Sequence, residues 1–162
     1  MKGGGMASAK LVVQVAWIVL WIVVSVGCKP NEPRYHYFEQ LPDEAWSQDQ
    51  EIFFSTSDLD STQLYDVDLV LRLKRDIRYQ QLPIGVAFET PSRHFTTRVI
   101  NVPLSHLRLR SGGFAIYEQS LRIEEGVQYP EQGVYTYSVR QLSTDSIVKG
   151  VVEVGLTMTP RE

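Results

Sequence analysis

The chain has 162 residues with a single cysteine, and its 16 Lys and Arg against 19 Asp and Glu give a net charge of −3. This acidic balance disfavours a nucleic acid as partner, because phosphate backbones are bound by basic surfaces. One cysteine excludes an internal disulfide. The length suits one domain with a single core rather than two domains.

Residues 11–24 form a short apolar run, LVVQVAWIVLWIVV, behind the basic residues Lys2 and Lys10. A membrane-spanning helix needs about 20 apolar residues, so this pattern is more typical of a secretory signal peptide. The run ends in SVGC, where small residues suit a signal peptidase and Cys28 offers a thiol for acylation, for example by palmitate. We predict a lipoprotein signal peptide over residues 1–27, and the SVGC segment resembles the lipobox of bacterial lipoproteins. An uncleaved signal anchor is the alternative.

Residues 28–36 follow the predicted cleavage point and contain the polar stretch KPNEPR with two prolines. Such a composition is typical of a flexible tether. We therefore expect a lipidated tether over residues 28–36 and a folded domain over residues 37–162.

Apolar and polar residues alternate through most of residues 37–162, which is the pattern of half-buried strands. In the clearest run, YDVDLVLRL, Tyr65 and every second residue to Leu73 share one apolar face. Strands are predicted at residues 51–57, 65–73, 83–89, 94–102, 121–125, 133–142 and 151–159.

Turn-forming segments separate these runs, and no window after Cys28 keeps a helical apolar stripe. At most, PDEAWSQDQ (42–50) or PLSHLRL (103–109) forms a helical turn. Seven or eight short strands with little helix predict an all-β fold, a single antiparallel β-sandwich of the jelly-roll or immunoglobulin-like Greek-key type.

Catalytic and metal-binding patterns are weak. His36, His94 and His106 are scattered singly, without the paired spacing of a zinc site. We predict no catalytic residues, no metal and no cofactor. An enzyme, our third hypothesis, would need His94 or His106 beside clustered carboxylates in a cleft.

Close carboxylates also occur, as in Asp58 with Asp60 and Asp66 with Asp68. They allow a glycosidase or a calcium site, but in SDLDST an ordinary Asp- and Ser-rich turn is favoured. The basic stretches LRLKRDIR and LRLR are interpreted as solvated strand faces, because they lack interleaved exposed aromatic residues.

Aromatic residues crowd the start of the predicted domain. Phe38 and Trp46 are expected to close one open end of the core, and the alternative is an exposed aromatic surface that binds a partner.

Four blocks in order carry a family resemblance: YHYFEQLPDEAWSQDQEIFF, QLYDVDLVLRLKRDIRYQQLPIGVAF, YPEQGVYTYSVRQL and VKGVVEVGLTM. Together with the lipoprotein signal, this chain resembles the GldH family of gliding-motility lipoproteins from Bacteroidota. The matching residues include Phe38, Trp46, Tyr65, Gly133, Tyr135 and Gly155. The resemblance implies a cell-envelope lipoprotein that acts with other gliding lipoproteins and the type IX secretion machinery, and it implies no catalytic residues.

Three of these residues have a physical interpretation. Gly133 after Pro130 suits a turn that needs positive φ. With Tyr135 it resembles a tyrosine corner, in which a tyrosine hydroxyl bonds nearby backbone. Gly155 indicates a β-bulge or a close backbone approach in the last strand.

The favoured function is a non-catalytic lipoprotein that assembles or stabilises the gliding-motility and type IX secretion apparatus. We expect the membrane to be contacted through the lipid, at the outer membrane and facing the periplasm, because Glu32 is the only acid close to Cys28. The expected partners are other gliding-motility lipoproteins or secretion components. An outer-membrane carbohydrate-binding lipoprotein is the alternative, and it would need a row of exposed coplanar aromatic rings.

Overall fold

The structure is a computed structural model that describes residues 32–104, 108–109 and 116–161. The predicted signal peptide and residues 28–31 of the predicted tether, Cys28 among them, lie outside the described residues. Among the described residues, no helix is long and apolar enough to cross a membrane.

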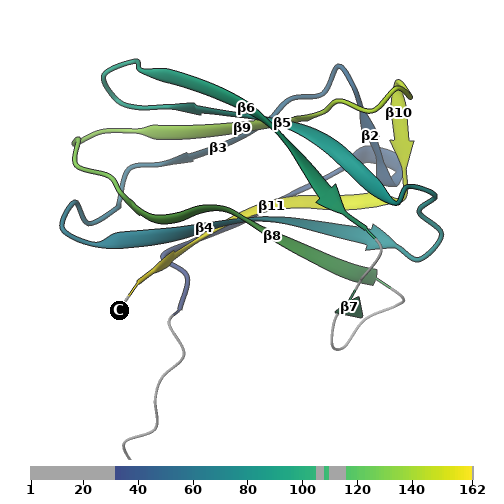
Figure 1. Cartoon of the computed structure of the whole chain (residues 1–162), viewed down its shortest axis with the longest axis horizontal. Coiled ribbons are helices and arrows are strands. Elements are labelled where there is room, and N and C mark those ends of the chain that lie inside the picture. The colour runs from purple at the N-terminus through teal and green to yellow at the C-terminus, as the bar shows by residue number, and fades with distance from the viewer. Residues whose placement is uncertain (1–31, 105–107, 110–115, 162) are drawn as a thin grey trace, which may run out of the picture. The chain divides into compact units, whose positions relative to one another are not determined.

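Two antiparallel sheets pack face to face (Figure 1). The predicted all-β antiparallel sandwich is thereby confirmed. The first sheet has the order β1 (Tyr35–Gln40), β11 (Val151–Pro160), β4 (Leu64–Lys74), β8 (Ile116–Gln128) and β7 (Arg108–Leu109). The second has the order β3 (Ile52–Thr56), β9 (Tyr135–Gln141), β5 (Gln81–Glu89) and β6 (Phe95–Pro103). A small third sheet pairs β2 (Ala45–Ser47) with β10 (Ile147–Lys149), and Pro42–Glu44 form the 3-10 turn η1.

Each of the seven predicted strands corresponds to an observed one, namely β3, β4, β5, β6, β8, β9 and β11. Four observed strands were not predicted: β1, β2, β7 and β10. Three of these, β2, β7 and β10, have only two or three residues and are too short to show a pattern. β1 begins inside the expected tether, because Tyr35 and His36 pair with β11 and the Arg34 amide donates to the Met158 carbonyl at 2.7 Å.

The core lies between the two main sheets and is made by the predicted alternation. Tyr65, Leu69 and Leu73 are at most 1 % exposed, because they point inward from β4 in register with β11. Trp46 is fully buried and its indole N–H donates to the Gln50 carbonyl at 3.0 Å. Trp46 therefore fills the core beside the small β2–β10 sheet.

The expectation for Phe38 as a core residue is wrong. Phe38 lies directly opposite Gly155 on the outer face of the first sheet, and the guanidinium carbon of Arg72 is 3.6 Å from the centre of its ring. A Cβ added at Gly155 would lie 2.4 Å from that ring. Gly155 thus makes room for an aromatic ring and not for a close backbone approach. The expected β-bulge is not at Gly155 either, because the irregular register of β11 lies between Val151 and Glu153.

The turn between β8 and β9 has the bonding of a tyrosine corner. The Tyr135 hydroxyl donates to the Glu131 carbonyl at 3.0 Å and accepts the Glu131 N–H at 2.7 Å. Gly133 has a φ of 131°, and a Cβ there would lie 2.9 Å from a carbon of Pro91. These contacts hold the start of β9 against the β5–β6 turn.

Candidate functional site

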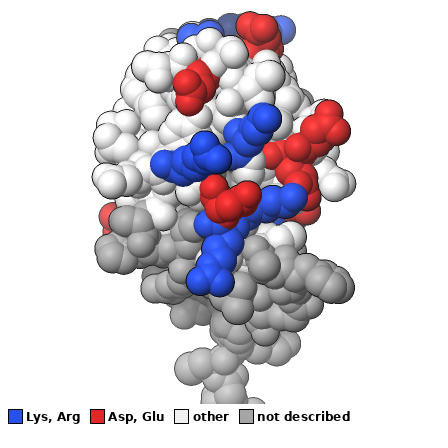
Figure 2. Space-filling view, turned by 90° about the vertical axis from the view of Figure 1, so that its right-hand side faces the viewer, with Lys and Arg blue, Asp and Glu red and all other residues white. Residues whose placement is uncertain are grey.

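A polar cleft of about 930 Å³ opens at the end of the sandwich where β4 passes into β5. Its walls come from η1, the loop after β4 and the strand β10. Figure 2 views the molecule from this end, where Lys and Arg side chains cross the middle and Asp and Glu side chains lie around them. The cleft therefore presents charges of both signs.

The backbone of η1 shapes one wall of the cleft. Asp43 and Glu44 both have a φ of 53°, a left-handed conformation that residues other than glycine seldom adopt. The Gly150 amide holds this turn by donating to the Glu44 carbonyl at 2.8 Å, and Lys74 forms an ion pair with the Glu44 carboxylate. Such backbone persists where surrounding contacts over-determine it and is frequent at binding sites.

Some charges in the cleft are paired and others are free. The Tyr79 hydroxyl donates to the Asp145 carboxylate, and this hydrogen bond raises the pKa of Tyr79. Within the described ranges, four lining residues make no ion pair or side-chain hydrogen bond: Asp43, Asp76, Arg78 and Lys149. Since these side chains are free, the cleft suits a charged, hydrogen-bonding segment better than an apolar ligand.

Sequence analysis missed this cleft. The stretch LRLKRDIR was interpreted as a solvated strand face, but its strand part ends at Lys74 and the Arg72 side chain is buried against Phe38. Arg75, Asp76 and Arg78 lie in the following loop. The sequence did contain a sign that the strand ends here. The alternation of apolar and polar residues stops at Arg75, because two polar residues follow Lys74.

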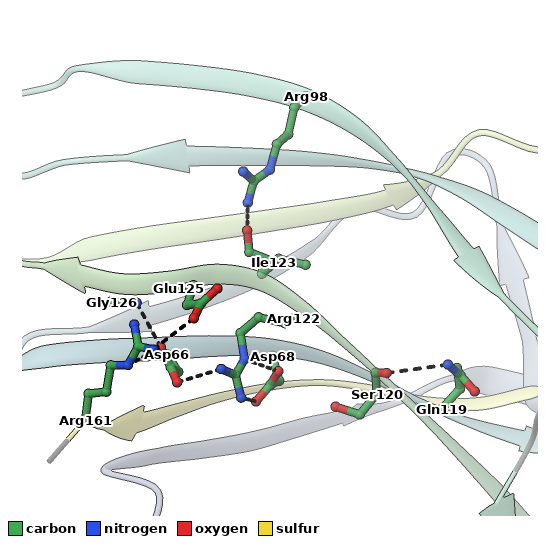
Figure 3. Close-up of polar contacts among 10 residues, drawn as sticks. All are labelled: Asp66, Asp68, Arg98, Gln119, Ser120, Arg122, Ile123, Glu125, Gly126 and Arg161. Carbon is green, nitrogen blue, oxygen red and sulfur yellow. Dashed lines mark hydrogen bonds and ion pairs between the residues drawn. The ribbon is translucent and has the colours of Figure 1, made fainter.

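A second charged region covers the outer face of the first sheet (Figure 3). Arg122 donates to Asp66 at 2.6 Å and to Asp68 at 2.7 Å, and the hydrogen bond with Asp68 raises the pKa of Arg122. Arg161 donates to Glu125 at 2.9 Å. Asp66 and Asp68 are therefore held in ion pairs by an arginine on the neighbouring strand β8.

The acidic turn SDLDST has the hydrogen bonds of an ordinary Asp turn. One carboxylate oxygen of Asp60 accepts the Thr62 amide at 2.8 Å and the Thr62 hydroxyl at 2.7 Å, and the amide hydrogen bond lowers the pKa of Asp60. Across the residues that the structure describes, no group of three His, Cys, Asp or Glu could hold a metal ion.

The histidines lie apart. The ring of His36 is 4.9 Å from that of Phe38, and His94 Nδ1 is 2.9 Å from the Ser92 hydroxyl oxygen in the exposed β5–β6 turn. His106 lies outside the described residues. Neither His36 nor His94 forms an ion pair with a carboxylate in the described part of the chain.

Within the described residues, the aromatic rings that are fully buried belong to the core. Burial raises the pKa of Tyr129 and of Tyr137, whose hydroxyl oxygens are 2.9 Å apart. The exposed rings belong to separate strands: Tyr37 on β1, Phe53 on β3 and Phe95 on β6. Within the described ranges, these rings do not form the coplanar row that a carbohydrate-binding surface would need.

The fold and these surfaces define an all-β sandwich domain that follows an apolar N-terminal segment. Residues 34–158 match the sequence model of the GldH lipoproteins. The chain is also 25 % identical over 146 residues to a gliding motility lipoprotein GldH homolog from Christiangramia forsetii, a match that covers 87 % of this chain and 89 % of that protein. The chain therefore belongs to the GldH lipoprotein family and is a gliding-motility-related lipoprotein.

A solved structure also aligns with the chain, the infectious bursal disease virus VP2 subviral particle. The alignment covers 84 % of this chain and 35 % of the viral chain, at 12 % sequence identity and a TM-score of 0.34. The chain thus spans about a third of that viral chain.

Proposed function

We propose that this chain is a non-catalytic lipoprotein, anchored through Cys28, that assembles or stabilises the gliding-motility and type IX secretion apparatus. The observation that carries the proposal is the family match over residues 34–158. The SVGC segment before that range supports a lipid anchor at Cys28, with acyl chains that hold the protein on a membrane.

We infer that the anchor lies in the outer membrane and that the domain faces the periplasm. The tether after Cys28 starts with Lys29 and contains one acid, Glu32, so it lacks the acidic segment expected of a surface-exported lipoprotein. A periplasmic position leaves the domain free to contact a secretion or motility assembly.

The polar cleft is the surface that we assign to the partner contact. Its free charges of both signs are Asp43, Asp76, Arg78 and Lys149. A partner segment with complementary charges would pair with them, and such pairs give specificity more than affinity. The partner is a gliding-motility lipoprotein or a type IX secretion component.

Labelled palmitate tests the anchor. We expect incorporation into the wild type and none into Cys28→Ala, whereas equal labelling of both proteins would reject the lipid site. Protease treatment of intact cells tests the orientation, and rapid digestion of the domain would place it on the cell surface instead.

Co-purification from envelope extracts tests the partner contact. The double variant Arg78→Glu with Lys149→Glu reverses two free charges of the cleft, so we expect it to retain at least about tenfold less partner. Arg140→Glu is the control for a single charge reversal outside the cleft, because Arg140 is exposed on the outer face of the second sheet. Equal retention by all three proteins would place the partner contact elsewhere.

A further inference from the structure

β6 forms an edge of the second sheet. Within the described residues it is nine residues long and pairs only with β5. Long exposed edges pair readily with other chains, and soluble proteins usually guard them with lysine, proline, bulges, inward-pointing charges or short length. Here proline occurs only at the last position, Pro103.

The first half of β6 is open to solvent on both faces. Phe95 and Val99 are 65 % and 63 % exposed, the highest values among the large apolar side chains of the described ranges. Thr96 and Arg98 are exposed as well, although their side chains point to the side of the first sheet. Solvent therefore reaches both sides of this half of the strand.

Arg98 is the one charged residue of β6, and it is already engaged. Its guanidinium donates to the Ile123 carbonyl and to the Glu124 carboxylate, the latter at 2.7 Å (Figure 3 shows the contact with Ile123). Because this arginine is turned toward β8, no free charge repels a strand that approaches the open edge of β6.

We propose that β6 is a homodimer interface, at which it pairs antiparallel with β6 of a second copy in a register centred on Thr97. In this register Phe95 lies opposite Val99 of the second copy, Val99 lies opposite its Phe95, and the two Thr97 residues face each other. Aromatic–β-branched and Thr–Thr pairs are among the favourable cross-strand pairs. The interface is isologous, as in two-fold dimers generally.

Neighbouring registers are worse. A register centred on Arg98 would set two arginines opposite each other, which destabilises a strand pair. A register centred on Val99 would set Phe95 opposite Pro103, which has no N–H to donate. The sequence of β6 thus favours the register centred on Thr97 over these two.

The dimer is compatible with two lipid anchors and goes beyond the proposed function. The two-fold axis of an antiparallel strand pair is perpendicular to the sheet. The same face of each copy therefore points in the same direction along this axis. Both lipid anchors can then reach one membrane that lies perpendicular to the axis.

Disulfide trapping of the full chain tests the register. Thr97→Cys should give a covalent dimer under mild oxidation, because Cα atoms of facing residues lie about 4.5–5.5 Å apart, within the range of a disulfide. Ser55→Cys, exposed on the opposite edge strand β3, is the matched control, and the wild type is the blank. Cross-linking of Thr97→Cys no faster than of Ser55→Cys would overturn the proposal.

Mass measurement of the purified full chain tests the dimer without a cross-link. We expect a wild-type dimer, a dimer in Ser55→Lys, and at least about tenfold weaker association in Thr97→Lys, which places like charges at the centre. At a concentration low enough for the wild type to be monomeric, the melting temperature of Thr97→Lys should equal that of the wild type, since Thr97 is exposed and the stabilising effect of dimerisation is then absent from both proteins. A monomeric wild type, or a Thr97→Lys variant that associates as tightly as the wild type, would overturn the proposal.

Discussion

The two outer faces of the sandwich differ in charge although both follow the same alternation. On the first sheet, Arg72 pairs with Glu118 and Glu153, and Arg122 pairs with Asp66 and Asp68. On the second sheet, one row across the strands consists of Phe53, Ser138, Ala87 and Thr97. Ion pairs between strands cross the first face, whereas this row of the second face has small and apolar side chains and a hydrogen bond from Ser138 to Glu51 at 2.6 Å. Alternation decides which side chains point outward, and their chemistry decides which face can bind.

The core beneath both faces should give the largest effect. Trp46→Ala removes a fully buried indole, and such truncations cost about 3–5 kcal/mol. Denaturant unfolding measures the loss, and both outer faces should be destabilised together. If Trp46→Ala kept wild-type stability but lost partner binding, Trp46 would belong to a binding surface.

Gly155→Ala should disturb side-chain packing on the outer face of the first sheet only. The added methyl would collide with the Phe38 ring, and such overpacking costs about 1–3 kcal/mol. The double variant with Phe38→Ala should recover part of this loss, because the smaller side chain leaves room. Equal stability of Gly155→Ala and the wild type would show that the ring moves aside freely.

High pH should destabilise the core between the faces. Burial raises the pKa of Tyr129 and Tyr137 in the folded state, so their contribution is complete below the ordinary tyrosine pKa of about 10. Above that pH the unfolded chain loses protons that the folded protein keeps, and stability falls by about 1.4 kcal/mol per pH unit for each tyrosine. Tyr137→Phe should lower this slope in unfolding measured between pH 9 and about 11.5. An unchanged slope would mean that Tyr137 ionises as readily when folded as when unfolded.

Arg122→Gln and Phe53→Ser give the smallest effects and compare the faces directly. Arg122 is a surface residue with two carboxylate partners, so its loss should cost at most about 1 kcal/mol and less at high salt. Phe53 is 60 % exposed, so Phe53→Ser should stay within about 0.5 kcal/mol of the wild type. Unfolding at low and high salt measures both, and a salt-dependent loss in Phe53→Ser would contradict the comparison.

Local pattern predicted the strands well. In β4 the alternation from Tyr65 to Leu73 matches the buried face. β8 is much longer than the predicted residues 121–125. Its first part was missed because the apolar Ile116 points outward and the polar Gln119 points inward, so the alternation is interrupted there. β2 and β10 escaped prediction since three residues are too few to show a period.

The candidate site was less accessible to prediction than the fold. The turn at Gly133 and the hydroxyl contact of Tyr135 followed from residue types within the short segment 130–135. The cleft did not, because its walls combine residues near 43, 76 and 149. Proximity of such distant segments depends on strand order, which alternation does not encode.

The sequence by itself determined the family, the strand-rich class and the inward face of each long strand, because an alternation of period two is a local property. Only the tertiary structure decided that Phe38 covers Gly155 and that Arg122 holds Asp68, 54 residues away. It also decided that β6 stands at an open edge. These features depend on register and strand order, which result from packing the whole core and not from any one segment.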